Sequence, residues 1–83
     1  MARRGGWRRV GSGRGFRYVD SWGESITDGE KLERIRELAI PPAWQDVWIS
    51  PNPGAKLQAV GIDRAGRRQY LYSRAYRAAQ EQE

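Results

Sequence analysis

Short stretches in which apolar side chains alternate with polar ones, or run together, recur along the chain and stop at turn-forming residues. Four of them lie at residues 16–20, 46–50, 57–62 and 67–72. Such stretches, rich in aromatic and β-branched residues, are typical of β-strands. A polar turn after the first of them can fold residues 24–26 back as a short further strand. The pattern predicts a small antiparallel sheet.

One stretch has the helical period instead. Thr27 and Glu30 have the spacing of a capping box, so we expect Thr27 to be the N-cap of a helix that continues to about Ala39. Apolar side chains recur on one face of this helix, and charged ones such as Arg34 lie on the face that we expect to meet water. Pro41 ends the helix, because its ring disfavours a helical conformation in the residue before it.

Two more features complete the predicted fold. Residues 40–44 read Ile-Pro-Pro-Ala-Trp, a rigid apolar corner from which Trp44 is expected to pack against the helix and the sheet. Ser73 is suited to cap a final helix over residues 74–82, where alanines favour helix. The predicted fold class is therefore α+β, a small curved antiparallel β-sheet of about five strands with two or three short helices.

Composition narrows the chemistry that 83 residues can support. The chain has no Cys and no His, so it lacks disulfides, thiolate and imidazole metal ligands, and the usual general base near neutral pH. We expect no metal site and no cofactor. No apolar run is long enough to span a membrane, and the N-terminus lacks the apolar core of a secretory signal. These features are compatible with a cytoplasmic protein, which is our expectation.

The charge points to a polyanionic partner. The chain has 15 basic and 10 acidic residues, a formal charge of +5, and four Trp and four Tyr. Nearly all the basic residues are Arg, whose planar fork suits phosphate and guanine. Nucleic acid is the simplest such partner. A coding bias that favours Arg over Lys explains the ratio of the two equally well, but explains the clustering of Arg less well.

Residues 1–15 are rich in Arg and Gly. Gly loses backbone entropy on folding and Arg repels Arg, so this segment is predicted to be a disordered basic arm. As an arm it is suited to follow a phosphate backbone, with Arg8, Arg9 and Arg14 as auxiliary phosphate contacts. A solubilising tail with no binding role is the alternative.

Residues 67–72 are an unusual strand, because Leu71 is their only aliphatic residue. Arg and Gln have the geometry to read purine edges in a major groove, and Tyr hydroxyls bind phosphate. Strand alternation puts Gln69 on the face opposite Tyr70 and Tyr72. The candidate DNA-binding residues are Arg67, Arg68, Gln69, Tyr70 and Tyr72. The alternative is a solvent-exposed hairpin whose polar face is merely basic.

No constellation for catalysis is present. The carboxylates are scattered without paired spacing, and the Gly-rich residues 11–15 precede a strand rather than follow one, so they do not form a nucleotide-binding loop. We therefore place no catalytic residue in this chain. By its residues alone it is a binding module rather than an enzyme.

Several of these stretches, in this order, resemble one family: the N-terminal domain of bacterial and poxvirus-like type IB DNA topoisomerases. The resemblance covers about residues 15–77, nearly all of the foldable chain. Its most specific parts are the Ile-Pro-Pro-Ala-Trp corner and the Gly-Arg-Arg-Gln-Tyr sequence. The stretches that carry it are residues 15–20, 26–28, 32–35, 38–44, 46–49 and 57–59, followed by Gly61, Asp63, residues 66–70 and Tyr72.

The resemblance implies a function beyond what composition indicates. Enzymes of this family relax supercoils without ATP or metal, through a 3′-phosphotyrosyl bond formed by a larger C-terminal domain. Their N-terminal domain is half of a C-shaped clamp and lies on the major-groove side of duplex DNA. On this chain Gln69 and Tyr72 correspond to the base-contacting pair, Tyr70 to a phosphate contact, and Arg67 to a residue that supports cleavage.

The resemblance also implies an organisation of the chain. Residues 16–77 are the clamp domain, and residues 78–83 begin a helix or linker toward an absent catalytic domain. The expected partners are double-stranded DNA and that catalytic domain, with the protein acting as a monomer. Two other classes stay open: a stand-alone RNA or single-strand binding module that stacks bases on Tyr70, Tyr72 or Trp48, and a protein-interaction domain whose sheet pairs with a partner chain.

Overall fold

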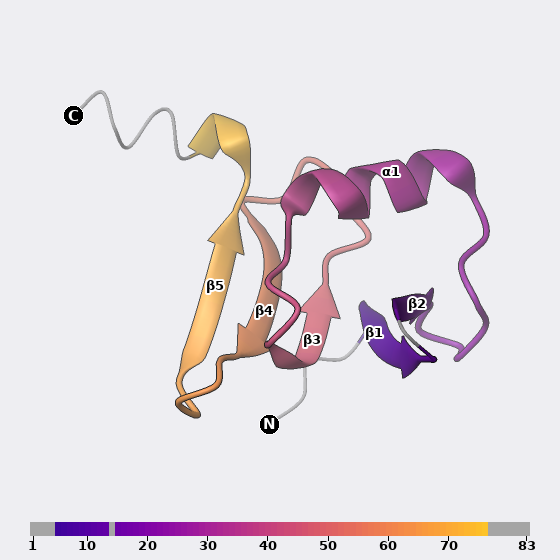
Figure 1. The fold of residues 1–83 in the computed structure, drawn as a ribbon. Coiled ribbons are helices and arrows are strands. Elements are labelled where there is room, and N and C mark those ends of the chain that lie inside the picture. Colours follow the sequence, from indigo (N-terminus) through magenta and orange to yellow (C-terminus); the bar gives the residue numbers. More distant parts are fainter. Residues whose placement is uncertain (1–4, 14, 77–83) are drawn as a thin grey trace.

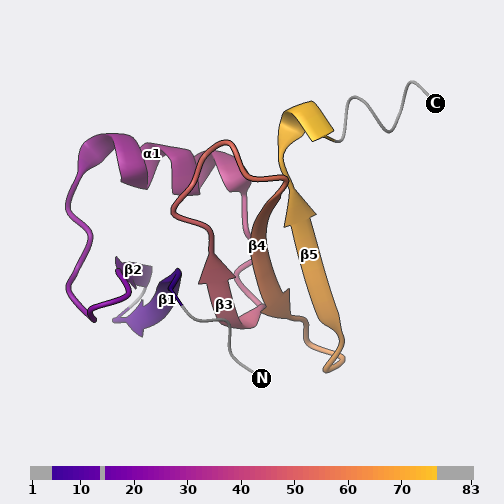
Figure 2. The same cartoon turned by 180° about the vertical axis from the view of Figure 1, so that it is seen from behind.

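The structure, a computed structural model, describes residues 5–13 and 15–76. One antiparallel sheet has the strand order β2-β1-β3-β4-β5, so β2 and β5 are its edges (Figure 1). A single helix, α1 (Gly29–Leu38), lies against one face of this sheet, and residues 74–76 add one helical turn (Figure 2). The α+β class is confirmed. The strands are β1 (Trp7–Ser12), β2 (Gly15–Val19), β3 (Gln45–Ile49), β4 (Leu57–Ile62) and β5 (Arg68–Tyr72).

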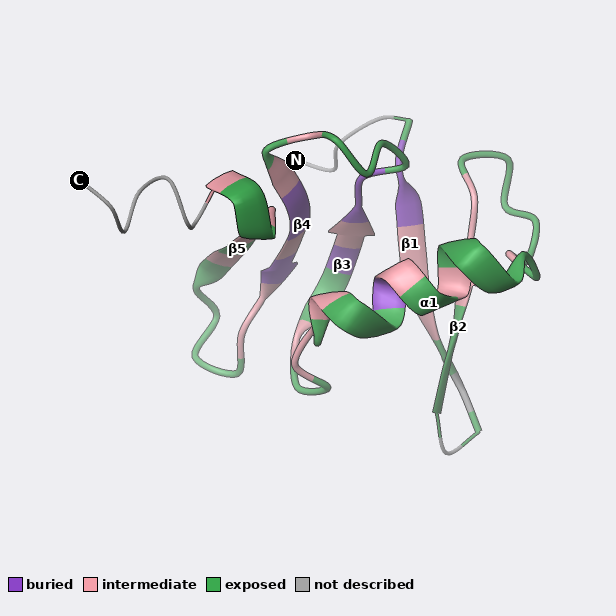
Figure 3. Cartoon of the chain, turned by 90° about the horizontal axis from the view of Figure 1, so that it is seen from above, coloured by how far each residue is buried: buried purple, intermediate pink, exposed green. Residues whose placement is uncertain are grey.

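The core lies between α1 and the sheet. Residues that are paired directly opposite each other on neighbouring strands share one face. One such row runs from β1 to β5 and faces α1: Trp7, Ile49, Ala59 and Leu71. Together with Ile35 of α1 the first three of these are buried (Figure 3). The helix crosses β3, β1 and β2, whereas β5 lies at the edge of the sheet away from it (Figures 1 and 3).

The other face of the sheet carries a second row. Arg8, Trp48, Val60 and Tyr70 are paired in sequence across β1, β3, β4 and β5. The first three are half-buried and Tyr70 is exposed. Because α1 covers only the opposite face, this second face is where large side chains remain accessible near β5.

The prediction of a disordered arm is wrong for residues 7–12, which form strand β1. This strand pairs with β2 along its length and with β3 at Trp7 and Arg8. Trp7 is buried under α1, and Arg9 donates hydrogen bonds to the carbonyl oxygens of Pro41 at 3.0 Å and Trp44 at 2.8 Å. Tertiary burial and pairing therefore overcome the local preference for disorder. Residues 1–4 and 14 of the predicted arm lie outside the described residues.

The fifth strand is β1 and not the predicted residues 24–26. That segment makes an isolated bridge between Val19 and Ser25, with the Ile26 amide donating to the Tyr18 carbonyl at 2.7 Å. Residues 77–82 of the predicted last helix lie outside the described residues. Ser73 caps the helical turn as expected, since its Oγ accepts a hydrogen bond from the Tyr76 amide at 3.1 Å.

The helix begins one residue later than predicted. Asp28, not Thr27, is its N-cap, and the Asp28 Oδ1 accepts hydrogen bonds from the amides of Glu30 at 2.9 Å and Lys31 at 3.1 Å. A carboxylate at this position also complements the positive end of the helix dipole. Ala39 ends the helix in a left-handed conformation with a φ of 52°.

Arg34 does not face water as expected. Its guanidinium donates to the Gln58 side chain and to the Ser50 carbonyl, and it lies 5.0 Å from the ring centroid of Trp7. Gln58 reaches the helix side because a register shift in β4 lets it face α1 together with Ala59. The charged residue of the helix is thereby used to fasten α1 to the sheet.

Two hairpin turns have the same structure. In each, an Asp is followed three residues later by a Gly with positive φ, 84° at Gly23 and 83° at Gly66. In each, one carboxylate oxygen of the Asp accepts the amides of the second and fourth residues after it, at 2.9–3.0 Å. Asp20 starts the first turn and Asp63 the second. Both are therefore self-contained turns whose shape is set by Asp and Gly.

Two tryptophans lie directly on glycines. The ring of Trp44 packs on Gly61, where an added Cβ would lie 2.5 Å from the Trp44 ring. The ring of Trp48, on the other face, packs on Gly6, where a Cβ would lie 1.7 Å away. The prediction that Trp44 packs against the sheet is confirmed. Within the described part of the chain, no helix is long and apolar enough to cross a membrane.

Gly61→Ala should destabilise the domain by about 1–3 kcal/mol, because the new methyl overlaps the Trp44 ring. Gly11→Ala is the matched control: this strand glycine has no atom within 4 Å of an added Cβ and a φ outside the left-handed region. We expect the control to be neutral or to stabilise by up to about 1 kcal/mol. Urea unfolding of both variants measures the difference, and equal midpoints would contradict the packing of Trp44 on Gly61.

Arg9→Lys should cost about 1–2 kcal/mol of stability, because an ammonium cannot span the carbonyls that the guanidinium fork reaches. Arg64→Lys, an exposed residue at the tip of the second turn, is the control and should be neutral. Thermal unfolding of the two variants decides the matter. If both variants unfold at the same temperature as the wild type, the Arg9 hydrogen bonds contribute nothing to stability. Arg9 would then be available for a ligand.

Candidate nucleic-acid interface

The candidate strand β5 lies at an edge of the sheet, beyond the cover of α1 (Figure 3). Its exposure alternates: Arg68, Tyr70 and Tyr72 are exposed, whereas Gln69 and Leu71 are half-buried. The predicted alternation is confirmed. Tyr70 and Tyr72 expose 43% and 42% of their surface, which is high for aromatic residues in a strand.

The aromatic residues of β5 continue into the helical turn. The ring centroids of Tyr70 and Tyr72 are 6.5 Å apart, and those of Tyr72 and Tyr76 are 5.2 Å apart. The Lys56 ammonium lies 5.6 Å from the Tyr76 ring centroid. Three phenols and a cation thus form one row. Sequence reasoning did not include Tyr76 or Lys56, because the turn that brings them beside Tyr72 is a tertiary feature.

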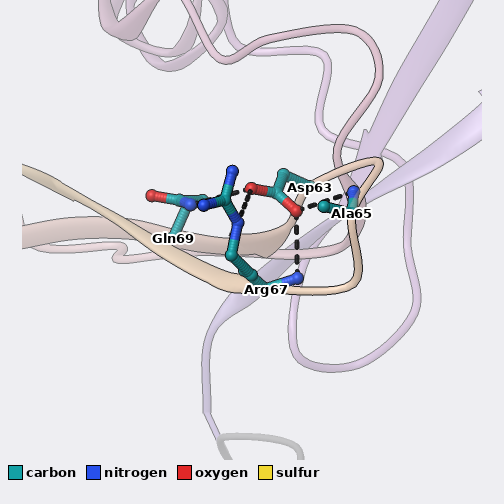
Figure 4. Close-up of polar contacts among 4 residues, drawn as sticks. All are labelled: Asp63, Ala65, Arg67 and Gln69. Atoms are coloured by element: carbon teal, nitrogen blue, oxygen red, sulfur yellow. Dashed lines mark hydrogen bonds and ion pairs between the residues drawn. The ribbon is translucent and has the colours of Figure 1, made fainter.

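Arg67 and Gln69 are held by one carboxylate (Figure 4). The Gln69 Nε2 donates to Asp63 Oδ2 at 2.8 Å, and the Arg67 Nε lies 3.3 Å from the same oxygen. The other oxygen, Oδ1, accepts the backbone amides of Ala65 and Arg67, both at 2.9 Å. Asp63 was not among the predicted site residues, although its place six residues before Gln69 across a hairpin is visible in the sequence.

The charge on Asp63 is stabilised where it lies. The Arg67 amide and then the Gln69 side-chain amide hold the pKa of this carboxyl below its ordinary value, and the Arg67 guanidinium acts in the same direction. The carboxylate therefore accepts hydrogen bonds with both oxygens at neutral pH. The Arg67 side chain remains 74% exposed, so its outer nitrogens face solvent while its Nε stays on Asp63.

Gln69 and the tyrosines diverge to opposite faces of β5. Gln69 is paired with Gly61, the residue on which Trp44 packs from the helix side. Tyr70 is paired with Val60 on the other face. The register shift in this hairpin lies between Leu57 and Ala59 of β4, so it does not rotate β5. A ligand that contacts both sets must therefore approach the edge of the sheet and not one of its faces.

Positive charge collects around this edge. Residues 56–74 include five basic side chains and one acidic side chain, Asp63. The basic ones are Lys56, Arg64, Arg67, Arg68 and Arg74. Five positive charges and one negative charge give this segment a net charge of +4, which suits a polyanion.

The three arginines expected as auxiliary phosphate contacts lie in different places. Arg8 is half-buried in the row that contains Trp48, on the face away from α1. Arg9 is committed to the fold through its hydrogen bonds to carbonyl oxygens, and burial lowers the pKa of its guanidinium. Arg14 lies outside the described residues. The structure therefore brings neither Arg8 nor Arg9 to β5.

Trp48 and the acidic residues are the other side chains of interest for ligand binding. Trp48 is half-buried on Gly6, so its ring is engaged in packing. Among the described residues, no group of three or more His, Cys, Asp or Glu side chains is arranged to hold a metal ion. The chemistry available at this edge is hydrogen bonding, charge and aromatic contact.

Comparisons with known proteins identify the family of this domain. The family described as "Bacterial DNA topoisomerase IB, N-terminal domain" matches residues 15–63, more than half of the chain, from β2 through the end of β4. The DNA topoisomerase 1B of Acanthamoeba polyphaga mimivirus is 40% identical over 68 residues, which are 82% of this chain and 20% of the viral protein. The chain thus spans about a fifth of that relative's length. The resemblance inferred from the sequence is confirmed, and the chain belongs to the family of N-terminal domains of bacterial DNA topoisomerases IB.

Proposed function

We propose that this chain is the duplex-DNA-binding clamp domain of a type IB DNA topoisomerase. The parent enzyme would relax supercoiled DNA without ATP or metal, through a 3′-phosphotyrosyl bond formed in a C-terminal catalytic domain. Family membership supports the parent activity. The observation that carries the binding role is β5: an edge strand with a Gln on one face, two exposed Tyr on the other, and basic residues around it.

The geometry favours an edge-on approach to the major groove. That groove is about 12 Å wide and admits a two-stranded β-ribbon. With the β4–β5 hairpin in it, Gln69 would point to one side of the groove and Tyr70 and Tyr72 to the other. In this arrangement the sheet curves around the duplex and forms half of the clamp, and the catalytic domain closes the other side.

Roles follow from side-chain chemistry. Gln69 and Tyr72 contact base edges, and Tyr70 contacts phosphate. Arg68, exposed on the same face as Tyr70, adds a second phosphate contact. Arg67 keeps its Nε on Asp63 and presents its outer nitrogens, which suits a fixed contact near the cleavage site. Of the three N-terminal arginines, Arg9 is left out because its guanidinium is already bonded to the fold.

One observation favours a second function. The exposed row of Tyr70, Tyr72 and Tyr76 provides ring faces on which the bases of a single strand could stack. A protein-interaction role is less well supported. Pairing of β5 with a partner strand would bring Arg67 and Arg68 against that strand, and charged residues at a sheet edge oppose such pairing.

The proposal includes the setting of the parent enzyme. Its partners are double-stranded DNA and its own catalytic domain, and the binding domain acts as a monomer. A bacterial enzyme of this kind works on the chromosome, which places it in the cytoplasm at the nucleoid.

Arg68→Ala should weaken binding to all duplexes alike and reduce the salt slope, d log K/d log[salt], by about one unit, because one phosphate contact is lost. Arg17→Ala, which removes an exposed Arg from the opposite edge strand β2, is the matched control and should leave the slope unchanged. Tyr70→Phe should weaken binding without changing the slope, since no charge is removed. Fluorescence titrations at several salt concentrations measure all three.

The same titrations distinguish the candidate functions. Duplex should bind more tightly than the corresponding single strand, with amide shifts at β5 in a parallel NMR titration. Tighter binding of the single strand would favour the stacking function. If Arg17→Ala lowers the affinity and the salt slope as much as Arg68→Ala does, the proposal that β5 is the interface is wrong.

The chain alone should neither nick nor relax supercoiled plasmid. The reacting tyrosine and its helpers belong to the C-terminal domain that the family resemblance implies, and this chain has no His that could join them. A plasmid relaxation assay at stoichiometric protein checks this expectation. Relaxation that co-purifies with the chain through successive columns would contradict it.

A further inference from the structure

Asp63 restricts which atom of Gln69 can be offered to a ligand. An ionised carboxylate can only accept hydrogen bonds, so the group that Gln69 turns toward Asp63 Oδ2 at 2.8 Å must be its NH₂. Within the described residues the Gln69 Oε1 has no hydrogen-bond donor. Gln69 therefore presents its Oε1 acceptor outward and keeps one of the two N–H donors of its NH₂ on Asp63.

Two sets of contacts fix the Asp63 carboxylate, and with it the Gln69 amide. Asp63 cannot rotate away without losing the turn, because its Oδ1 accepts the Ala65 and Arg67 amides at 2.9 Å each. The Arg67 Nε lies 3.3 Å from Oδ2 and keeps the carboxylate charged and oriented (Figure 4). Hydrogen bonds to an ionised acceptor are among the stronger ones in proteins, so the Gln69 amide is preset before any ligand arrives.

We propose that Asp63 is a positioning residue that sets the base preference of this site, by fixing the polarity of the Gln69 amide so that its Oε1 reads major-groove amino groups. The proposal rests on the proposed duplex-binding function. A free Gln can turn either its Oε1 or its NH₂ toward a given base atom. Held by Asp63, Gln69 has its Oε1 fixed outward, so it accepts from the adenine N6 or cytosine N4 amino group.

Asp63→Asn should reverse this polarity. The Asn Oδ1 must still accept the two turn amides, so its Nδ2 replaces Oδ2 and becomes a donor. Gln69 then turns its Oε1 inward and its NH₂ outward. Asp20→Asn is the matched control, because Asp20 starts an identical turn in which the sixth residue on is Ile26 rather than a Gln.

The probe is a short hairpin duplex with a stem of A·T pairs, titrated with wild type, Asp63→Asn, Asp20→Asn and Gln69→Ala. In one analogue 2-aminopurine replaces adenine and removes the N6 amino donor from the major groove. In a second, 7-deazaadenine removes the N7 acceptor and keeps the amino group. Each analogue can weaken binding for reasons unrelated to Gln69. The part of the loss that is present in the wild type and absent in Gln69→Ala is the part due to Gln69.

For wild type and Asp20→Asn we expect 2-aminopurine to weaken binding about 3- to 10-fold, the effect of one hydrogen bond. For Asp63→Asn we expect that 2-aminopurine no longer weakens binding, because the NH₂ of Gln69 faces the base, and that 7-deazaadenine does. In the free protein, the Gln69 side-chain NH₂ resonances should shift strongly in Asp63→Asn and stay in place in Asp20→Asn.

Several results would overturn the inference. Wild-type binding that is not weakened by 2-aminopurine would mean that the Gln69 Oε1 does not read the amino group. Identical analogue sensitivity in wild type and Asp63→Asn, or unchanged Gln69 NH₂ resonances, would remove Asp63 from the role. If the chain binds no duplex at all, the proposed function falls together with this inference, whereas duplex binding without the reversal defeats the inference alone.

Discussion

The burial of Trp7 under α1 is the contact on which the rest of the structure depends. Its side chain is 7% exposed, lies opposite Ile49 in the sheet, and has the Arg34 guanidinium 5.0 Å and the Lys31 ammonium 5.8 Å from its ring. Strand β1 is the link between β2 and the other three strands, so β2 joins the sheet only through it. Two residues on, Arg9 fastens the same strand to the proline corner after α1. The sheet, the helix and the corner thus meet at one strand.

That strand is also the element that the sequence could not predict. Its neighbours are Arg and Gly, and local composition of this kind is typical of disorder. What makes it ordered is nonlocal: carbonyl oxygens from residues 40–44 satisfy Arg9, and α1 covers Trp7. Where the signal was local, prediction succeeded. Strands β3, β4 and β5 and the helix follow from period and turn chemistry, with boundaries that differ by one or two residues.

The features of the candidate site also divide into local ones, which the sequence predicts, and nonlocal ones, which it does not. Residue types in β5 and the alternation of its side chains could be read from the sequence, because a strand has period two. The edge position of β5, the addition of Tyr76 and Lys56 to the aromatic row, and the loss of Arg9 to the fold could not. Each of these depends on which distant segments pack together. The edge position matters most, because it allows residues on opposite faces of one strand to reach the same ligand.

The two identical turns show how a structural residue can acquire a second task. In both turns the backbone conformation by itself already requires the Asp and the Gly. Six residues after the first Asp the chain places Ile26, which packs on the core; six residues after the second it places Gln69, whose amide returns to the free oxygen of the same carboxylate. At the fourth position the first turn has the acidic residue Glu24, whereas the second has Arg67, which pairs with Asp63. The turn is constant, and its neighbours decide whether it only reverses the chain or also orients side chains at a basic edge. Since the carboxylate is already fixed by the turn, orienting Gln69 and Arg67 requires no further ordering of Asp63 itself.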